Sequence, residues 1–268
     1  MNNILVVKLG GGEGLDLAAA CDDLAQIARV RPVVIVHGVS GRMAELCRAR
    51  GVEPEMLISP TGHSSRYTPP HIRDLYVEAA RDANREIVDL LRLRGISAVS
   101  MADVPGGVLH GERKTAVRAL SNGRVRLIRD DYSGTIQQVN ALAVRQALEA
   151  GHVPVIPPMA DSPDGLLNVD GDRASAAVAA ALRVAELVIL SNVRGLLRDT
   201  ANPDSVIDRL DARQIDEAMG LAQGRMKRKI LGVQEAISGG VARVVIGDGR
   251  VGQPVSRALH GAGTEFVR

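Results

Sequence analysis

The sequence predicts an α/β protein with an open, mainly parallel sheet sandwiched between helices, either as one large unit or as two lobes that share one sheet. Short apolar runs recur without alternating polar residues, which is typical of strands buried on both faces of a parallel sheet. Segments with the apolar spacing of amphipathic helices separate these runs, and this alternation implies right-handed crossovers. The runs are residues 4–7, 33–36, 153–156, 187–190 and 244–246.

Composition narrows the functional class. The 268 residues carry a net charge of +2, and only 1% of them are aromatic. Nucleic-acid recognition by base stacking is therefore not expected, because it needs aromatic platforms. No apolar run approaches the roughly 20 residues of a membrane span, and no signal peptide precedes the first strand. We expect a cytoplasmic protein in which Cys21 and Cys47 are reduced core residues.

The first strand contains a lysine, Lys8, and leads directly into Gly10–Gly12. A lysine in a buried run calls for a negative partner, and three glycines allow a sharp turn with free N–H groups. Two readings stay open for this stretch: a phosphate site, or a tight turn whose lysine reaches water. The P-loop pattern is excluded because it needs a lysine after its last glycine, whereas Lys8 precedes the glycines here. The dinucleotide-binding pattern G-x-G-x-x-G is excluded because Leu15 stands in the place of its last glycine.

The first half of the chain continues the alternation. Apolar spacing predicts a helix over residues 17–28, and Ser40 can cap a helix that ends at Arg50. Residues 57–68 are polar and predict a loop or a small hairpin. Pro69 and Pro70 then begin a long helix that reaches about Arg94.

In the middle of the chain, residues 98–101 predict a strand. Residues 116–120 and 125–129 predict a hairpin whose turn contains Asn122-Gly123. Thr135 and Gln138 match a capping box for a helix that ends at Gly151.

The last part of the chain predicts further helices and strands. They are helices over 174–182, from Asp211 to Met219 (closed by Gly220), from Gly224 to Gly239-Gly240 and around 255–259, and a last strand from Glu265.

Several of these stretches, taken in order over the whole chain, resemble the amino-acid kinase family. The narrower resemblance is to its acetylglutamate-kinase branch, and there to kinases of 2-aminoadipate carried on a small amino-group carrier protein. The family motifs are Lys8 with Gly10–Gly12, His37-Gly38, Arg66, Asn168–Asp172, Ser191–Leu196 and Lys229; the strings for the narrower resemblance are 61–66, 113–117, 131–135 and 222–229.

The resemblance implies the amino-acid kinase fold, with a lobe over residues 1–183 that binds the acyl acceptor and a lobe over 184–268 that binds ATP. It implies phosphorylation of the side-chain carboxylate of 2-aminoadipate or glutamate, whose amino group is linked to an acidic carrier protein, in lysine or arginine biosynthesis. Mg²⁺ would arrive with ATP, without a metal site held by the protein. The chain would form a homodimer or a larger assembly.

Two other functions stay open. One is a kinase for free N-acetylglutamate in arginine biosynthesis. The other is a nucleotide-binding regulatory protein without catalysis, although the presence of Lys8, Asp172 and Lys229 together argues against it.

By the family motif, Lys8, Asp172 and Lys229 are the candidate catalytic residues. The two lysines would neutralise the transferred phosphoryl group from opposite sides. A carboxylate nucleophile is already ionised, so it needs no general base. Asp172 would hold both lysines, or it would cap the helix that follows, and the sequence leaves both roles open.

The candidate substrate-binding residues are Gly38, Val39, Arg66 and Asn168. Arg66 suits a carboxylate and Asn168 suits an amide, although a surface arginine and a turn residue are the plainer readings. Val39 stands where acetylglutamate kinases usually have a glycine. Because a β-branched residue disfavours positive φ, this difference puts free acetylglutamate and a Val39 contact in doubt. We interpret His37 as structural.

The candidate nucleotide-binding residues lie at strand ends and at a helix start. Lys227, Arg228 and Lys229 place three cations near a helix N-terminus. They form a solvated helix start, or they offset nearby phosphates, since three cations there oppose the helix dipole; of the three, Lys229 matches the family motif. The candidates are Gly10, Gly11, Gly12, Ser191, Asn192, Gly195, Leu196, Gly224 and Met226.

The segment 113–129 is basic and has no acidic residue. Strand alternation predicts Arg124, Arg126 and Arg118 on one face of the hairpin. The charges protect an exposed edge from aggregation, or they steer the acidic carrier protein toward Arg66.

Overall fold

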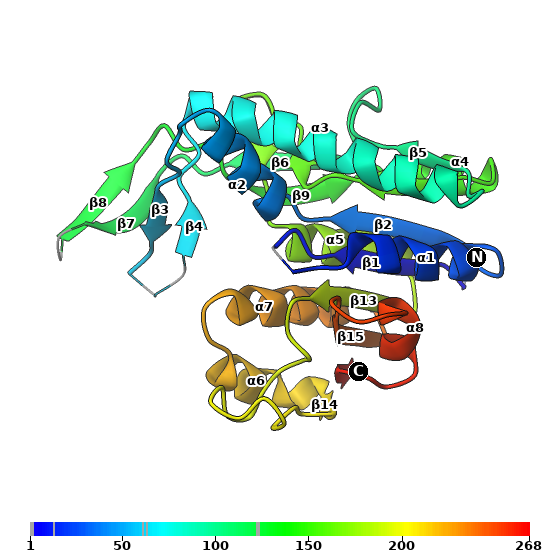
Figure 1. Cartoon of the computed structure of the whole chain (residues 1–268). Coiled ribbons are helices and arrows are strands. Elements are labelled where there is room, and N and C mark those ends of the chain that lie inside the picture. The colour runs from blue at the N-terminus through cyan, green and yellow to red at the C-terminus, as the bar shows by residue number, and fades with distance from the viewer. Residues whose placement is uncertain (1–2, 13, 61, 63, 122–123) are drawn as a thin grey trace.

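A computed structural model describes residues 3–12, 14–60, 62, 64–121 and 124–268, and it confirms the predicted fold class (Figure 1). In these residues one eight-stranded sheet runs through the molecule. Its neighbours pair in parallel, except that β15 and β16 are antiparallel. The strands, in spatial order, are β14 (Arg209–Asp211), β16 (Thr264–Val267), β15 (Arg243–Asp248), β13 (Glu186–Ser191), β1 (Leu5–Leu9), β2 (Val33–His37), β10 (Val153–Ile156) and β5 (Ala98–Ser100).

Helices cover both faces of this sheet. The apolar side chains of β1 alternate between two cores: Val6 packs in the core that includes α5 and α7, and Val7 packs in the core that includes α1 and α8. Because side chains alternate along a strand, Lys8 lies on the same face as Val6, toward α5 and α7. The helices are α1 (Leu17–Ala28), α2 (Ser40–Ala49), α3 (Pro70–Leu93), α4 (Ala141–Glu149), α5 (Gly171–Leu182), α6 (Ile215–Leu221), α7 (Arg225–Ser238) and α8 (Pro254–Leu259).

Four two-stranded ribbons complete the described structure. Figure 1 shows two of them, β3–β4 and β7–β8, projecting from one end of the molecule. The hairpin alternative for residues 57–68 is confirmed; Thr61 and His63, and the predicted turn at Asn122-Gly123, lie outside the described residues. The ribbons pair β3 (Met56–Ile58) with β4 (Ser64–Arg66), β6 (Leu109–Arg113) with β9 (Gly134–Val139), β7 (Val117–Ser121) with β8 (Arg124–Ile128), and β11 (Met159–Ala160) with β12 (Leu167–Asn168).

The predicted capping box at Thr135 and Gln138 is wrong. Residues 134–139 form β9, which pairs antiparallel with β6. The helix begins later, at Ala141, and Asn140 caps it by accepting a hydrogen bond from the N–H of Ala143. β9 forms because it pairs with β6, and a local sequence pattern cannot reveal such a pairing.

Other helix boundaries also differ from the predicted ones. The N-cap of α2 is Val39, so Ser40 is the first helical residue and makes no side-chain cap bond. The segment after Asp211 begins as a 3₁₀ helix (Ala212–Gln214), and α6 continues through Gly220 to Leu221.

The strands formed by residues up to 183 and those formed by later residues occupy opposite halves of the sheet. They meet where β1 pairs with β13. The division of substrate and nucleotide between residues 1–183 and 184–268 stays a prediction. Cys21 and Cys47 are free and buried, as expected. In the described part of the chain, no helix is both long and apolar enough to cross a membrane.

Candidate active site

Two lysines share one carboxylate at the carboxyl end of β1. The ammonium Nζ of Lys8 lies 2.8 Å from Oδ1 of Asp172. The Nζ of Lys229 lies 3.0 Å from Oδ2 of the same residue. All three residues are buried, with exposed fractions of 5%, 6% and 8% for Lys8, Asp172 and Lys229. The structure thus brings together the three predicted catalytic residues.

Glycines make this close approach sterically possible. A Cβ atom on Gly232 of α7 would stand 3.1 Å from the backbone carbonyl of Asp172, so a side chain there would push α7 away from α5. A Cβ on Gly171 would stand 3.5 Å from Cε of Lys8. Gly232 therefore keeps α7 near enough to α5 for Lys229 to reach this carboxylate, whereas a Cβ on Gly171 would meet Lys8 at an ordinary contact distance.

The charges of this cluster act strongly on one another. Burial opposes ionisation of Asp172, but Lys229 and Lys8 outweigh it and hold the pKa of this carboxyl well below its usual value. Burial lowers the pKa of Lys229, an effect that Asp172 opposes and the neighbouring Lys8 reinforces. The cluster of two ammonium groups and one carboxylate therefore presents a net positive charge to any ligand that contacts it.

The helix cap of α5 is Asp170 rather than Asp172. Oδ1 of Asp170 accepts hydrogen bonds from the N–H groups of Asp172 and Arg173. Asp172 lies in the first helical turn, and its side chain bonds the lysines instead. Burial and the neighbouring Asp172 raise the pKa of Asp170. The sequence interpretation missed Asp170, although the pattern Asp-Gly-Asp before a helix contains two cap candidates.

The glycine turn after β1 packs directly against the turn after β2. A Cβ atom on Gly11 would overlap the backbone of Gly38 and Val39, and a Cβ on Gly38 would overlap Gly11. A Cβ on Gly10 would stand 3.0 Å from the carbonyl oxygen of Leu190. Gly12 is more open, because no backbone atom of the described residues lies within 4 Å of its Cβ position.

The backbone of Val39 removes the steric objection to this residue. Its φ angle is −129°, so it does not adopt the positive-φ conformation that a β-branched side chain disfavours. Its side chain is buried in a small core with Met43. The doubt about Val39 as a contact came from an assumed positive φ, which the structure does not have.

His37 is engaged by the protein itself. Its Nε2 lies 3.1 Å from Nδ2 of Asn84, whose amide donates, so the ring is neutral with its proton on Nδ1. That Nδ1 lies 3.1 Å from the carbonyl oxygen of Gly38. Complete burial lowers the pKa of His37 to about 4. These contacts support the structural interpretation of this histidine.

Arg66 and Asn168 are linked through one buried threonine. Nδ2 of Asn168 donates to Oγ1 of Thr68 at 3.0 Å, and this hydroxyl donates to the carbonyl oxygen of Arg66 at 3.1 Å. The atom Nη1 of Arg66 is buried and has no hydrogen-bond partner among the described residues. A buried guanidinium donor without a partner is costly, so this N–H group is available to a ligand atom.

Asp131 holds the backbone of this substrate side. Its two carboxylate oxygens accept the N–H groups of Thr68 at 2.9 Å and Ser133 at 2.7 Å. The N–H of Tyr132 donates to Thr68, and the N–H of Asn168 donates to Tyr132. Asp131 and Thr68 were missed as positioning residues; only the resemblance of the string 131–135 pointed to this segment.

The predicted nucleotide-binding residues near β13 do not share one environment. Ser191 is buried at the end of the strand, and Asn192 is exposed. The N–H of Leu196 donates to Oγ1 of Thr264 at 2.8 Å, and a Cβ on Gly195 would stand 2.6 Å from the same atom. Gly195 and Leu196 therefore pack within the fold, whereas Asn192 is open to a ligand.

The start of α7 carries the remaining candidates. Gly224 precedes the helix with φ +51°, a conformation that favours glycine. Met226 is half-buried and packs against the core under α5 and α7. The helix has no side-chain cap. The N–H of Met226 donates to the carbonyl oxygen of Gln223, which leaves the neighbouring N–H groups of the first turn available to a ligand.

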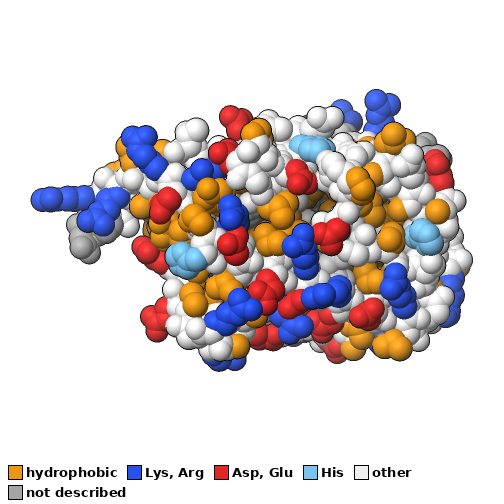
Figure 2. Space-filling view, turned by 90° about the horizontal axis from the view of Figure 1, so that it is seen from above, with side chains coloured by type: hydrophobic (Ala, Val, Ile, Leu, Met, Phe, Trp, Pro, Cys, Tyr) orange, Lys and Arg blue, Asp and Glu red, His pale blue; other side chains and the backbone are white. Residues whose placement is uncertain are grey.

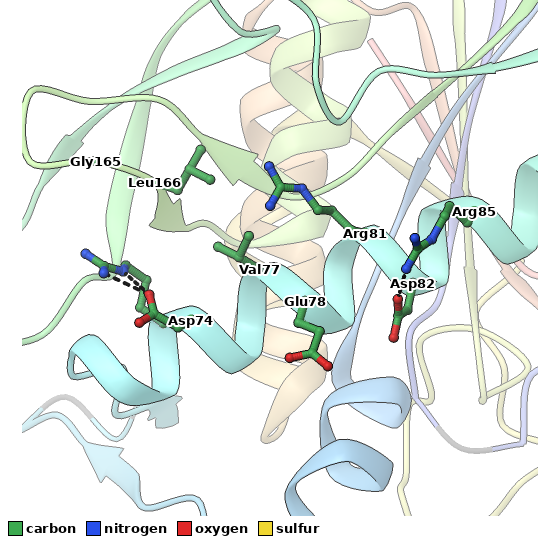
Figure 3. Close-up of a pocket in the computed structure, with 9 residues that line it drawn as sticks. Asp74, Val77, Glu78, Arg81, Asp82, Arg85, Gly165 and Leu166 are labelled. Carbon is green, nitrogen blue, oxygen red and sulfur yellow. Dashed lines mark hydrogen bonds and ion pairs between the residues drawn. The ribbon is translucent and has the colours of Figure 1, made fainter.

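A separate hollow of about 510 Å³ lies along α3 and the loop at Gly165 and Leu166 (Figure 3). Three arginines line it, and each has an acidic partner: Arg73 with Asp74, Arg81 with Asp103, and Arg85 with Asp82. None of the candidate site residues lines this hollow. Its charges are compensated within the chain, unlike the net positive cluster at Lys8.

Comparison with known proteins decides the family. The model of the amino acid kinase family matches residues 3–248. The chain belongs to the amino-acid kinase family. It is 41% identical to a "[LysW]-aminoadipate kinase" of Deinococcus radiodurans, over 98% of this chain and 91% of that protein. It is 37% identical to a protein of the same name from Thermus thermophilus, over 97% and 99% of the two chains.

Solved structures agree on the amino-acid kinase fold. N-acetylglutamate synthase of Neisseria gonorrhoeae superposes with a TM-score of 0.79 at 24% identity, and this chain spans 60% of its length. Carbamate kinase of Giardia lamblia, bound to AMP-PNP, superposes with a TM-score of 0.68 at 14% identity over 99% and 98% of the chains. As an amino-acid kinase, the protein is an ATP-dependent phosphotransferase with a carboxyl group as acceptor.

Proposed function

We propose that this amino-acid kinase phosphorylates the side-chain carboxylate of 2-aminoadipate whose amino group is linked to the carrier protein LysW. The product is an acyl phosphate of lysine biosynthesis. The observation that carries the proposal is the single carboxylate of Asp172 shared by Lys8 and Lys229. The names of the relatives from Deinococcus radiodurans and Thermus thermophilus support the choice of substrate.

The chemistry needs charge neutralisation more than proton transfer. A carboxylate oxygen attacks the γ-phosphorus while the bond to the β-phosphate oxygen breaks, and ADP leaves with that electron pair. Lys8 and Lys229 contact the equatorial oxygens, and Asp172 keeps both ammonium groups in place. No proton has to move, because the acceptor is ionised at neutral pH.

ATP supplies the phosphoryl group, and Mg²⁺ bound to its phosphates offsets their charge. The open position of Gly12 and the uncapped start of α7 fit a phosphate chain. In the described residues, no group of three or more His, Cys, Asp or Glu side chains could hold a metal ion. Mg²⁺ would be held by the phosphate oxygens of ATP, as expected from the resemblance.

The acceptor would be held by residues of the substrate side. The buried, unpartnered Nη1 of Arg66 suits the free α-carboxylate of the substrate. Asn168 suits the amide that links the substrate to its carrier. Gly38 and Val39 lie where the turn after β2 meets the glycine turn, and their backbone would border the side-chain carboxylate.

Glutamate on the same carrier is a second substrate within this proposal. Aminoadipate and glutamate differ by one methylene group, which is worth only about 1–3 kcal/mol of discrimination in a pocket. A relative from Saccharolobus islandicus, 32% identical over 98% of this chain, is named "[LysW]-aminoadipate/[LysW]-glutamate kinase". Assembly as a homodimer or larger stays a prediction from the resemblance.

The direct test traps the acyl phosphate with hydroxylamine. Purified protein, ATP and Mg²⁺ are combined with carrier-linked aminoadipate, carrier-linked glutamate or free N-acetylglutamate. We expect the highest kcat/KM for carrier-linked aminoadipate. Turnover of N-acetylglutamate alone would instead support the kinase of arginine biosynthesis. Nucleotide binding without hydroxamate from any substrate would support the regulatory alternative.

The projecting β7–β8 ribbon is a candidate docking surface for the acidic carrier. Figure 2 shows Lys and Arg side chains gathered at this projecting end. Arg126 pairs with Ala119 across the ribbon, so Arg124 and Arg126 share one face. Arg118 pairs with Leu127 and lies on the opposite face, which corrects the prediction that it joins the other two. That opposite face also carries the exposed Leu120, Val125 and Leu127.

Reversing the charge of the Arg124 face should slow the encounter with the carrier. We expect Arg124→Glu with Arg126→Glu to lower kcat/KM for the carrier-linked substrate at low salt and to leave the KM for ATP unchanged. Electrostatic steering fades as salt screens the charges, so the wild-type advantage should shrink with ionic strength. Arg118→Glu, on the opposite face, is the matched control. If the double variant handles the carrier-linked substrate normally at low salt, this face does not dock the carrier.

A further inference from the structure

One cation at the start of α7 has no role in the site described above. Arg225 precedes Lys229 by four residues, so both lie on the same face of α7. Side chains of a helix tilt toward its N-terminus. The face that directs Lys229 to Asp172 therefore directs Arg225 past the start of the helix, toward the glycine turn that follows β1.

The side chain of Arg225 reaches from the half of the molecule that contains α7 toward the half that contains the glycine turn after β1. Its Nη1 lies 3.7 Å from the point where a Cβ on Gly12 would stand, and Oγ of Ser40 lies 4.0 Å from the same point. Gly12 belongs to the turn after β1, whereas α7 packs in the other half of the molecule, beside β15. Arg225 thus borders the space between the open glycine and the uncapped start of α7.

The surroundings of Arg225 lack a compensating charge. Among the described residues it has no ion pair and no hydrogen bond, whereas Arg228 of the same helix lies 3.7 Å from Asp170. A charged neighbour that acts on it is another cation, Arg66, whose pKa is lowered mainly by burial and further by Arg225. Two guanidinium groups near one another, one with a buried free donor, leave a place for an anion.

We propose that Arg225 contacts the γ-phosphoryl oxygens of ATP and holds them over Gly12 for transfer. This inference rests on the proposed function and adds a residue to it. The cluster of Lys8, Lys229 and Asp172 has only one net positive charge, while the attacking carboxylate and the phosphates are all anionic. A planar guanidinium supplies two parallel donors to one phosphoryl group, which an ammonium cannot.

A position near the γ-phosphate also explains why an arginine stands at residue 225, in the first turn of α7, where a cation is otherwise unfavourable. A cation in the first turn of a helix opposes the helix dipole, and α7 has no acidic residue in that turn to offset it. A bound phosphoryl group makes the cation favourable there, because its oxygens accept hydrogen bonds from the guanidinium and from the N–H groups of the helix start that have no partner.

The test compares nucleotide binding by Arg225→Gln, Arg225→Lys and the control Lys227→Gln. Lys227 lies two residues from Arg225 on a different face of α7, and among the described residues it makes no ion pair or side-chain hydrogen bond with the site. Isothermal titration measures the affinity for ADP and for AMP-PNP, each with Mg²⁺ and without an acceptor. Losing a charge-assisted hydrogen bond to the γ-phosphate should weaken AMP-PNP binding by roughly ten-fold or more.

We expect Arg225→Gln to lose affinity for AMP-PNP and to keep the ADP affinity of the wild type, while Lys227→Gln changes neither. Arg225→Lys should recover part of the loss. Equal weakening of ADP and AMP-PNP would place Arg225 on the other phosphates and overturn the assignment, as would wild-type AMP-PNP affinity in Arg225→Gln. Because no acceptor is present, a protein that fails with carrier-linked aminoadipate but shows the AMP-PNP effect refutes the proposed substrate and retains this inference.

Discussion

Replacing Lys8 or Lys229 by Ala should lower kcat by about 10²–10³, because in the proposed mechanism each lysine neutralises charge that develops during transfer. The KM for ATP should rise far less than kcat falls, which separates a transition-state role from simple nucleotide binding. Steady-state kinetics at saturating ATP measure both quantities. Lys227→Ala on the same helix should retain wild-type kcat.

The folded state of the lysine variants has to be verified separately. In Lys8→Ala, Asp172 keeps its ion pair with Lys229, so the carboxylate is not left without a partner. Circular dichroism and the melting temperature then report whether the variant is folded. A folded Lys8→Ala protein with near-normal kcat would contradict a role of this lysine in phosphoryl transfer.

Asp172→Asn should abolish most turnover without disturbing the helix cap, because the cap of α5 is Asp170. The variant leaves two buried ammonium groups without their shared carboxylate, and breaking a buried ion pair typically costs about 3–5 kcal/mol of stability. We therefore expect a lower melting temperature together with a loss of about 10²–10³ in kcat. The KM for ATP should not rise, since the phosphates meet a more positive site.

Asp170→Asn is the matched control for this prediction. Asn caps a helix about as well as Asp, and the substitution leaves both ion pairs of Asp172 in place. Most of the turnover should survive in this variant. Full activity in Asp172→Asn would show that neither lysine needs its charged partner, and the shared carboxylate would lose its assigned role.

The parallel sheet could be predicted from sequence because its strands are continuous apolar runs. Residues 33–36 and 187–190 are buried on both faces, and such runs have few alternatives. The edge ribbons could not be predicted in the same way. Polar β9 forms because β6 pairs with it, and its sequence matches a helix cap equally well.

The site was predictable by residue type but not by geometry. A lysine in a buried strand and an Asp-Gly-Asp stretch before a helix indicated that charges meet, yet spacing alone could not assign Asp170 as the cap and Asp172 as the ion-pair partner. The network of Thr68, Asp131 and Asn168 joins three distant segments. Arg225 was passed over because its partner region, Gly12, lies more than two hundred residues away.

The central claim is that a carboxylate oxygen of the substrate attacks the γ-phosphorus while Lys8 and Lys229 hold the oxygens of the transferring phosphoryl group. Carrier-linked aminoadipate with oxygen-18 in its side-chain carboxylate tests it most directly. Hydroxylamine trapping cleaves the acyl phosphate at carbon, so the bridging oxygen leaves with the phosphate. The account predicts one oxygen-18 atom in each phosphate released with hydroxamate, measured by mass spectrometry. Phosphate without the label would mean that water attacks ATP, and it would contradict the account.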